Sequence, residues 1–157
     1  MRTVVYALSA MMLMAGQVAA QDKSVNTNME ILKEKIKADK KLLVADNMQL
    51  TDSEAKGFWP IYDAYQTDLA KINERLGKAI SGYAEAYDKD TLTDTQARQL
   101  TTDVIGIEES EVKLRRTYVG KLGKVLPGKK VARYLQIESK IRALIRFDLA
   151  SRIPLVE

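Results

Sequence analysis

Apolar residues recur along this chain at alternating steps of three and four, the spacing of one face of an α-helix. The longest such pattern lies in residues 52–88, and none of the positions that form its apolar stripe holds a charged residue. No segment shows sustained alternation of β-branched and polar residues, which would favour a strand. The pattern therefore predicts an all-α protein whose second helix packs along one continuous seam. The seam consists of Ala55, Phe58, Tyr62, Tyr65, Leu69, Ile72, Leu76, Ala79, Tyr83 and Ala86.

Three threonines mark helix starts, because each stands three residues before a Glu or Gln: Thr27, Thr51 and Thr93. In such a capping box the hydroxyl accepts a hydrogen bond from the third residue's amide, and that residue's side chain accepts one from the threonine amide. These starts and the apolar spacing predict helices over 28–46, 52–88, 94–125 and 129–152. The third repeats the seam with Ala97, Leu100, Val104, Ile107, Leu114, Tyr118 and Val125.

The second and third helices are expected to form a long antiparallel hairpin. Helices of about 32–37 residues run roughly 50 Å at 1.5 Å per residue, so the shape should be elongated. Two shorter helices cannot cover such a long apolar stripe, and a curved homodimer is expected to cover the rest. Pro60 removes one backbone hydrogen bond inside the second helix and is expected to kink it. The expected fold is thus an elongated, kinked four-helix hairpin arrangement that dimerises.

Residues 1–20 have the layout of a secretory signal peptide. Arg2 precedes an apolar stretch over residues 4–15, and the small side chains at Val18 and Ala20 suit cleavage after Ala20. The apolar stretch is shorter than the roughly 20 residues that cross a bilayer. We therefore expect residues 21–157 to be a single helical domain exported to the periplasm.

The chain contains neither cysteine nor histidine. This composition excludes disulfides, thiolate and imidazole metal sites, and histidine-based catalytic triads. No glycine-rich phosphate loop or nucleophile elbow occurs, so neither an enzymatic activity nor a cofactor is expected. The group Glu108, Glu109 and Glu111 has two interpretations. It could be a carboxylate site for acid/base work or a hard metal, or solvated helix-face charges with Glu111 paired to Arg115.

One short motif occurs twice, 42 residues apart, as Leu50-Thr51-Asp52-Ser53-Glu54 and Leu92-Thr93-Asp94-Thr95-Gln96. With these motifs the sequence resembles the Spy/CpxP family of periplasmic stress proteins, named for its LTxxQ motifs. The second copy matches fully, whereas the first carries Glu where the family favours Gln. The motif residues to be located in the structure are Leu50, Thr51, Glu54, Leu92, Thr93 and Gln96.

The resemblance implies a four-helix hairpin that dimerises into a thin, curved cradle. Members of that family hold unfolded envelope proteins without ATP, or restrain a stress-sensing kinase in the periplasm. Some related members bind zinc through histidines. Because this chain has no histidine, zinc sensing is not among our expectations.

Charge is distributed unevenly along the chain. Residues 21–112 carry 12 basic and 18 acidic side chains, a net charge of −6, whereas residues 113–157 carry 12 basic and 3 acidic, a net charge of +9. The basic half could pair with the acidic half of the same or a partner chain, or it could bind an anionic surface. Nucleic acid is not expected as a partner, because export separates the chain from it. The basic candidates for protein binding are Arg115, Arg116, Lys129, Lys130 and Arg133.

Aromatic residues near the start of the second helix also have two interpretations. Phe58, Trp59 and Tyr62 could line a surface for hydrophobic client segments, or they could form the core or a dimer seam. Trp59 lies one step off the seam and is the best candidate for a binding surface. The apolar tail over 153–157 cannot continue a helix through Pro154, and it either docks onto the hairpin or stays free.

The sequence therefore favours an ATP-independent periplasmic chaperone or envelope-stress adaptor that binds unfolded or specific envelope proteins as a homodimer. The alternative is a regulatory module that docks its basic face on the acidic periplasmic domain of a sensor. A third class, an enzyme or a metal-binding protein, would rest only on the glutamates at 108–111.

Overall fold

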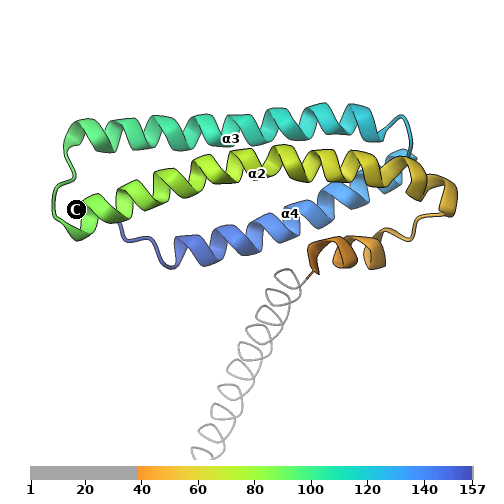
Figure 1. Cartoon of the computed structure of the whole chain (residues 1–157), viewed down its shortest axis with the longest axis horizontal. Helices are drawn as coiled ribbons and strands as arrows, with labels where there is room; N and C mark the ends of the chain where they lie inside the picture. Colours follow the sequence, from red (N-terminus) through yellow and green to blue (C-terminus); the bar gives the residue numbers. More distant parts are fainter. Residues whose placement is uncertain (1–38, 157) are drawn as a thin grey trace, which may run out of the picture. The chain divides into compact units, whose positions relative to one another are not determined.

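The computed structural model describes residues 39–156, and these are helical with short connections (Figure 1). Residues 39–48 are helical and precede α2 (Asp52–Asp88), α3 (Asp94–Leu122) and α4 (Gly128–Ala150). No strand occurs in residues 39–156, so the predicted all-α class is confirmed. The chain divides into two compact units at residues 44 and 45, and the second, residues 45–156 as described, holds the three long helices.

The predicted bounds of α2 agree with the structure at both ends. The first helix continues to residue 48, two residues beyond the prediction. Its predicted start, the capping box at Thr27 and the predicted signal peptide over 1–20 all lie outside the described residues. α3 ends at Leu122, three residues earlier than predicted, because Gly123 forms its C-cap and donates its amide hydrogen to the Val119 carbonyl. α4 runs from 128 to 150 instead of 129 to 152.

Both capping boxes within the described residues form as predicted. The Thr51 hydroxyl accepts from the Glu54 amide, and the Glu54 carboxylate accepts from the Thr51 amide at 2.8 Å. Thr93 and Gln96 repeat this arrangement at the start of α3. Each box satisfies two amides that the first turn of a helix would otherwise leave unpaired, which stabilises the helix by about 1 kcal/mol.

α2 and α3 form the predicted antiparallel hairpin (Figure 1). Every residue of the predicted α2 seam is buried or half-buried. The Tyr118 hydroxyl on α3 donates to a carboxylate oxygen of Asp68 on α2 at 2.8 Å. Further along, the Arg75 guanidinium donates to the Ser110 hydroxyl at 3.2 Å. Polar bridges thus flank the apolar seam and fix the register of the two helices.

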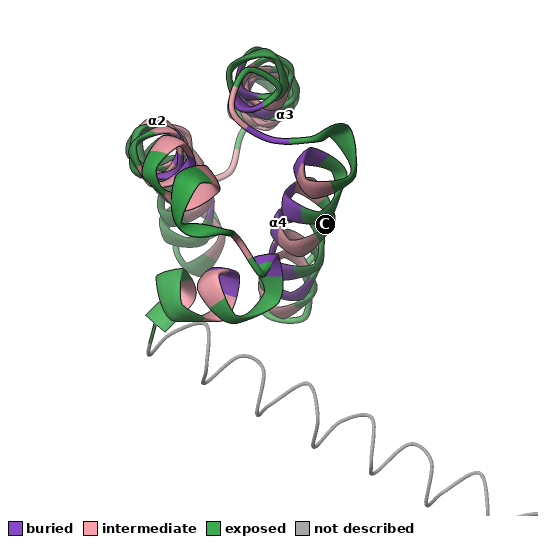
Figure 2. Ribbon diagram, turned by 90° about the vertical axis from the view of Figure 1, so that its right-hand side faces the viewer, coloured by how far each residue is buried: buried purple, intermediate pink, exposed green. Residues whose placement is uncertain are grey.

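The core between α2, α3 and α4 is largely aromatic. Phe58, Tyr65 and Tyr134 are at most 1% exposed, and the centroids of the Phe58 and Tyr134 rings lie 5.2 Å apart in an edge-to-face arrangement. Tyr65 makes the same kind of contact with Tyr118 at 5.2 Å. Figure 2 shows the buried residues on the faces that the three helices turn toward one another. Edge-to-face pairs add stability beyond the apolar area that they bury.

Burial is concentrated toward one end of the hairpin. Between residues 66 and 106, Tyr83 alone is buried. The residues of α2 that line the hollow beside α3 in this stretch include the small residues Ala79, Gly82 and Ala86. The tight aromatic core therefore lies near the α3–α4 connection, and the packing is looser toward the α2–α3 turn.

α2 continues without a break through Pro60, at which the sequence predicted a kink. Nearby, Gly57 allows a close approach, because a Cβ atom at this position would lie 2.9 Å from the Cβ of Val125 in the α3–α4 connection. Val125, predicted to be the last seam residue of the third helix, instead packs against α2 from the turn. Among residues 39–156, no helix is both long and apolar enough to span a bilayer.

Candidate functional site

A group of buried polar side chains lies beside the aromatic core, contributed by α2, α3 and α4. Glu111 on α3 is 5% exposed, and Glu138 on α4 is 2% exposed. The Glu111 carboxylate accepts from the guanidinium groups of Arg142 at 3.3 Å and Arg146 at 3.2 Å. The side-chain amide of Gln66 donates to Glu138 at 2.9 Å. Each buried carboxylate therefore has a donor, as the cost of removing a charge from water requires.

This arrangement corrects the interpretation of the glutamates at 108–111 as solvated helix-face charges. Glu111 is buried, Glu108 binds Arg146 at 2.6 Å, and Glu109 is exposed. The expected pair within the helix does not form through the Glu111 carboxylate. Instead, Arg115 Nε donates to the Glu111 backbone carbonyl at 3.4 Å. The interpretation failed because the partners come from α4, and spacing within one helix cannot show them.

Three tyrosines in this region keep their protons well above neutral pH. Burial, followed by the charge of Glu138, raises the pKa of Tyr65 to about 12. Burial and the hydrogen bond to Asp68 raise the pKa of Tyr118 to about 12. Burial and the nearby Glu138 also raise the pKa of Tyr134 far above its ordinary value. These hydroxyls therefore stay protonated, and a general base needs a pKa much closer to neutrality.

The chemistry available to this cluster is limited. Its carboxylates are bound by arginine and glutamine, and no group of three or more acidic side chains in residues 39–156 is placed to hold a metal ion. The Tyr65 hydroxyl is buried and forms no hydrogen bond with the described residues. The cluster therefore joins three helices and has the character of a structural element.

The first Leu-Thr motif is tied to α4. Glu54, which completes the capping box of α2, also forms an ion pair with Lys130. The Lys130 ammonium donates to the Gln49 carbonyl at 2.9 Å, and the Arg133 guanidinium donates to the Gln49 side chain at 3.4 Å. The hydrogen bond from Lys130, and to a smaller extent the one from the Thr51 amide, holds the pKa of Glu54 below its ordinary value. Lys130 and Arg133, predicted to bind other proteins, thus contact the loop before α2, while Leu50 in that loop is half-buried.

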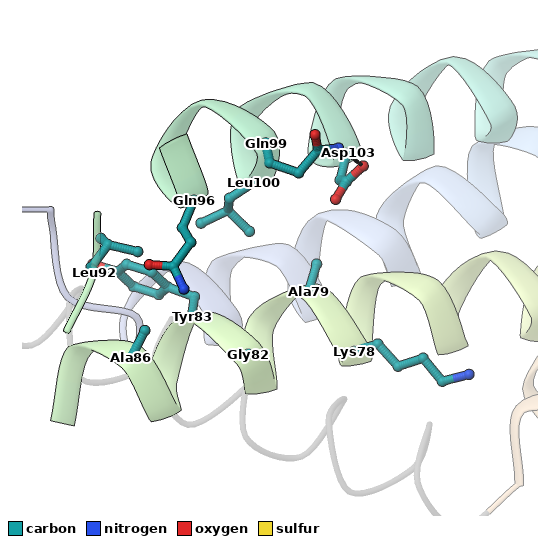
Figure 3. A pocket seen from close by; sticks show the side chains of 10 residues that line it. All are labelled: Lys78, Ala79, Gly82, Tyr83, Ala86, Leu92, Gln96, Gln99, Leu100 and Asp103. Carbon is teal, nitrogen blue, oxygen red and sulfur yellow. Dashed lines mark hydrogen bonds between the residues drawn. The ribbon is translucent and has the colours of Figure 1, made fainter. Parts of the chain in front are cut away.

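The second motif borders a shallow hollow of about 270 Å³ at the α2–α3 turn (Figure 3). Leu92 and Gln96 lie at one end of it beside Tyr83, and Thr93 caps the helix that follows. Small side chains on α2 leave the space open, and Lys78 extends away from it (Figure 3). The hollow places this motif on an accessible surface.

A second, more apolar groove of about 370 Å³ lies between α2, α3 and α4. The Glu108–Arg146 ion pair stands at its rim. The Tyr83 hydroxyl donates to the Pro154 carbonyl at 3.0 Å, so the tail docks onto the hairpin. Leu155 beyond it is 87% exposed. The apolar walls are formed by Leu76, Ile80, Leu100, Val104, Ile107, Leu149, Ala150 and Ile153.

The predicted aromatic binding residues are mainly core residues. Phe58 is fully buried and Tyr62 is 3% exposed, which favours the core interpretation for both. Trp59 is half-buried, and its ring stands edge-on to Phe58 with 5.0 Å between centroids. Trp59 is thus the one member of this predicted trio that offers surface to a partner.

The remaining basic candidates differ in exposure. Arg115 on α3 is half-buried. Arg116 and Lys129, in contrast, are exposed and form no ion pair with residues 39–156. Lys124 has the same character in the α3–α4 connection. The basic half of the chain thus pairs partly with the acidic half, through Lys130, Arg142 and Arg146, and partly remains open to solvent.

Glu138, Arg142 and Gln66 were not predicted as members of a buried cluster. A signal was present, because steps of three and four from Val131 reach Tyr134, Glu138 and Ile141 on one face of α4. A glutamate on an apolar face indicates a buried, paired charge. Comparisons of the chain with models of protein families, with curated proteins and with solved structures find no match.

Proposed function

We propose that this chain is a periplasmic, ATP-independent chaperone or envelope-stress adaptor that binds unfolded or specific envelope proteins. The observation that carries the proposal is the apolar groove between α2, α3 and α4. An apolar groove with a few polar groups at its rim suits an apolar segment of another chain. The predicted signal peptide and the two Leu-Thr motifs, through the resemblance to the Spy/CpxP family, support the periplasmic assignment.

The proposal includes a curved, elongated homodimer, and it includes no enzymatic activity. Exposed apolar side chains outside the groove supply further binding area, among them Ile145 at 48% and Phe147 at 64% exposure on α4. Such binding needs no nucleotide, because the burial of apolar surface between the groove and the client drives it at equilibrium.

The test is suppression of aggregation. The predicted mature chain, residues 21–157, is mixed at equimolar concentration with a reduced, unfolded client, and light scattering follows the client. The matched variants are Ala150→Leu, which fills the groove, and Ala132→Leu, which makes the same change on an exposed part of α4. We expect the wild type and Ala132→Leu to suppress aggregation and Ala150→Leu to require a larger excess. A wild type without effect on several clients would contradict the chaperone proposal.

A second candidate function is a regulatory module that docks on an acidic sensor domain. The exposed cations Arg116, Lys124 and Lys129, which form no ion pair within residues 39–156, favour it. Attraction between surface charges weakens with salt, because the screening length falls to about 3 Å at 1 M. Recovery of one sensor in a pull-down, lost at high salt and in Lys124→Glu, would support this function. Recovery that is unaffected by salt would contradict it.

A further inference from the structure

Two links join α2 to the C-terminal part of the chain, one on each side of the apolar groove. At the first, the side-chain amide of Gln66 donates to the Glu138 carboxylate at 2.9 Å. The second is the hydrogen bond from the Tyr83 hydroxyl to the Pro154 carbonyl, about 25 Å further along α2 at 1.5 Å per residue. The α2 residues of the groove wall that fall between the two links are Leu76 and Ile80. The separation of the groove walls is therefore held at two points.

The second link is made by the C-terminal tail, which crosses from the end of α4 to α2. α4 ends at Ala150, and the ring of Pro154 prevents a return to helical hydrogen bonding. Ile153 forms part of the groove wall, whereas Leu155 and Val156 are 87% and 55% exposed. The tail thus bridges the groove through one apolar side chain and one carbonyl oxygen.

This attachment is weak compared with the packing of the hairpin. The backbones of α2 and α3 approach each other closely, whereas the backbone of α4 stays further from both. The position of the end of α4 relative to α2 therefore depends on side-chain contacts such as that of Tyr83. A neutral hydrogen bond of this kind changes an equilibrium only about fivefold. The tail can therefore detach at a lower cost than the unfolding of a helix.

We propose that residues 153–156 are a strap that regulates access to the groove. While Tyr83 holds Pro154, the groove keeps its present width, and release of the strap admits an apolar segment of several residues. The closed groove of about 370 Å³ has the size of a site for one small ligand. A run of apolar side chains therefore needs the walls on α2 and α4 to separate. The inference rests on the proposed function and adds the regulation of its site.

Docking of the strap and binding of an apolar segment are then competing events. Only molecules with a released strap bind the segment, and the apparent affinity is reduced by the fraction of molecules in that state. A substitution that releases the strap therefore raises the affinity without adding any contact to the segment. This property separates the strap from an ordinary wall of the groove.

The first experiment removes the hydrogen bond of the strap. The protein is produced from its complete sequence as Tyr83→Phe, which keeps the ring and deletes the donor. We expect it to bind a fluorescein-labelled peptide with a run of apolar residues about fivefold more tightly than the wild type in fluorescence anisotropy. The matched control is Tyr87→Phe, because the Tyr87 ring lies 5.9 Å from that of Tyr83 but its hydroxyl forms no hydrogen bond with residues 39–156. The control should bind the peptide as the wild type does, and circular dichroism checks that each variant keeps its helices.

A small ligand separates an effect on the strap from an effect on the groove wall, to which Tyr83 also belongs. N-phenyl-1-naphthylamine is an uncharged dye that is small enough for the closed groove. We expect the wild type and Tyr83→Phe to bind the dye with equal affinity, because the dye does not need the strap to open. If the affinity for the dye rose by the same factor as that for the peptide, the substitution would act on the wall itself, and the proposal would be overturned.

The second experiment follows the tail itself. The chain contains no cysteine, so a nitroxide on Leu155→Cys reports from that position alone. We expect its electron paramagnetic resonance spectrum to show a more mobile label when the peptide saturates the groove. Adding Tyr83→Phe to the same chain should mobilise the label without the peptide. The same label on Ala132→Cys, on an exposed part of α4, should not respond.

The outcomes distinguish the strap from the proposed function. Equal binding of the peptide by the wild type and Tyr83→Phe, or a label on Leu155→Cys that stays equally restrained when the peptide is bound, would overturn the strap alone. Absence of peptide binding by the wild type and every variant would overturn both the strap and the proposed binding of apolar segments in the groove.

Discussion

Removal of the Glu111 carboxylate is the sharpest test of the buried cluster. In Glu111→Ala, Arg142 loses the carboxylate 3.3 Å from its Nε atom while its side chain remains only 17% exposed. Breaking a buried ion pair on one side costs about 3–5 kcal/mol, because the other charge is left unpaired. Arg146 keeps Glu108, so the low end of that range applies. We expect a loss of about 3 kcal/mol in the free energy of unfolding.

The assay is thermal and urea unfolding followed by circular dichroism. For a unit of this size, about 1 kcal/mol changes the melting temperature by about 4 °C, so Glu111→Ala should melt about 12 °C below the wild type. The control is Glu85→Ala, which makes the same substitution within α2 but breaks an exposed ion pair with Lys89. Exposed pairs contribute at most about 1 kcal/mol, and the control should melt within a few degrees of the wild type.

A double variant separates charge from packing. In Glu111→Met with Arg142→Met both buried charges are absent, and similar replacements of buried pairs are often neutral. We expect the double variant to be more stable than Glu111→Ala. Equal melting temperatures for Glu111→Ala and Glu85→Ala would refute the reasoning, because Glu111 would then contribute no more than a surface charge.

Three further predictions concern single side chains. Because the folded-state pKa of Glu54 lies below its ordinary value of 4.5, its contribution to stability is present above that value and is lost as the pH falls through the folded-state pKa. The urea midpoint of Glu54→Gln should lie below that of the wild type at pH 7, and the gap should close as the pH falls below 4.5. A gap independent of pH would contradict this. Gly77→Ala should raise the free energy of unfolding by about 1 kcal/mol, because a Cβ atom at this position would have no neighbour within contact distance. Gly57→Ala should lower the free energy of unfolding by about 1 kcal/mol, because its Cβ atom would lie 2.9 Å from the Cβ of Val125. Urea unfolding should therefore show changes of opposite sign for the two variants. Tyr65→Phe removes a hydroxyl that forms no hydrogen bond, so it should not lower the melting temperature. Tyr118→Phe removes the hydrogen bond to the Asp68 carboxylate and should lower the free energy of unfolding by about 1 kcal/mol. Equal losses of stability in the two variants would contradict these hydrogen-bond assignments.

The sequence predicted well those features that depend on neighbouring residues. The capping boxes at Thr51 and Thr93 and the seam of α2 follow from spacing within one helix, and the structure confirms them. The bounds of α2 were predictable because strong signals stand at its start and just beyond its end. In contrast, a single glycine is a weaker signal for the end of a helix. α3 therefore ends before Gly123, earlier than the apolar spacing indicated.

The candidate site was less predictable, because it depends on contacts between helices. The partners of Glu111 come from α4, and Lys130 reaches back to the start of α2. Spacing identified Phe58 and Tyr62 as seam residues, but it could not show whether the seam is closed by a third helix or left open. Which charges remain exposed, as Arg116 does, is likewise decided by packing.

The uneven burial along the hairpin has a consequence for local unfolding. The aromatic cluster and the ion pairs hold the part of the hairpin near the α3–α4 connection, whereas Tyr83 alone is buried between residues 66 and 106. Segments with few buried contacts open at lower free energy than the molecule as a whole. Backbone amides near Gly82 and Leu100 should therefore exchange with deuterium through openings that leave those near Tyr134 protected. The ends of α2 and α3 beside their turn can thus separate and close again many times in the lifetime of one folded molecule. Each such opening exposes the groove walls while the core remains intact.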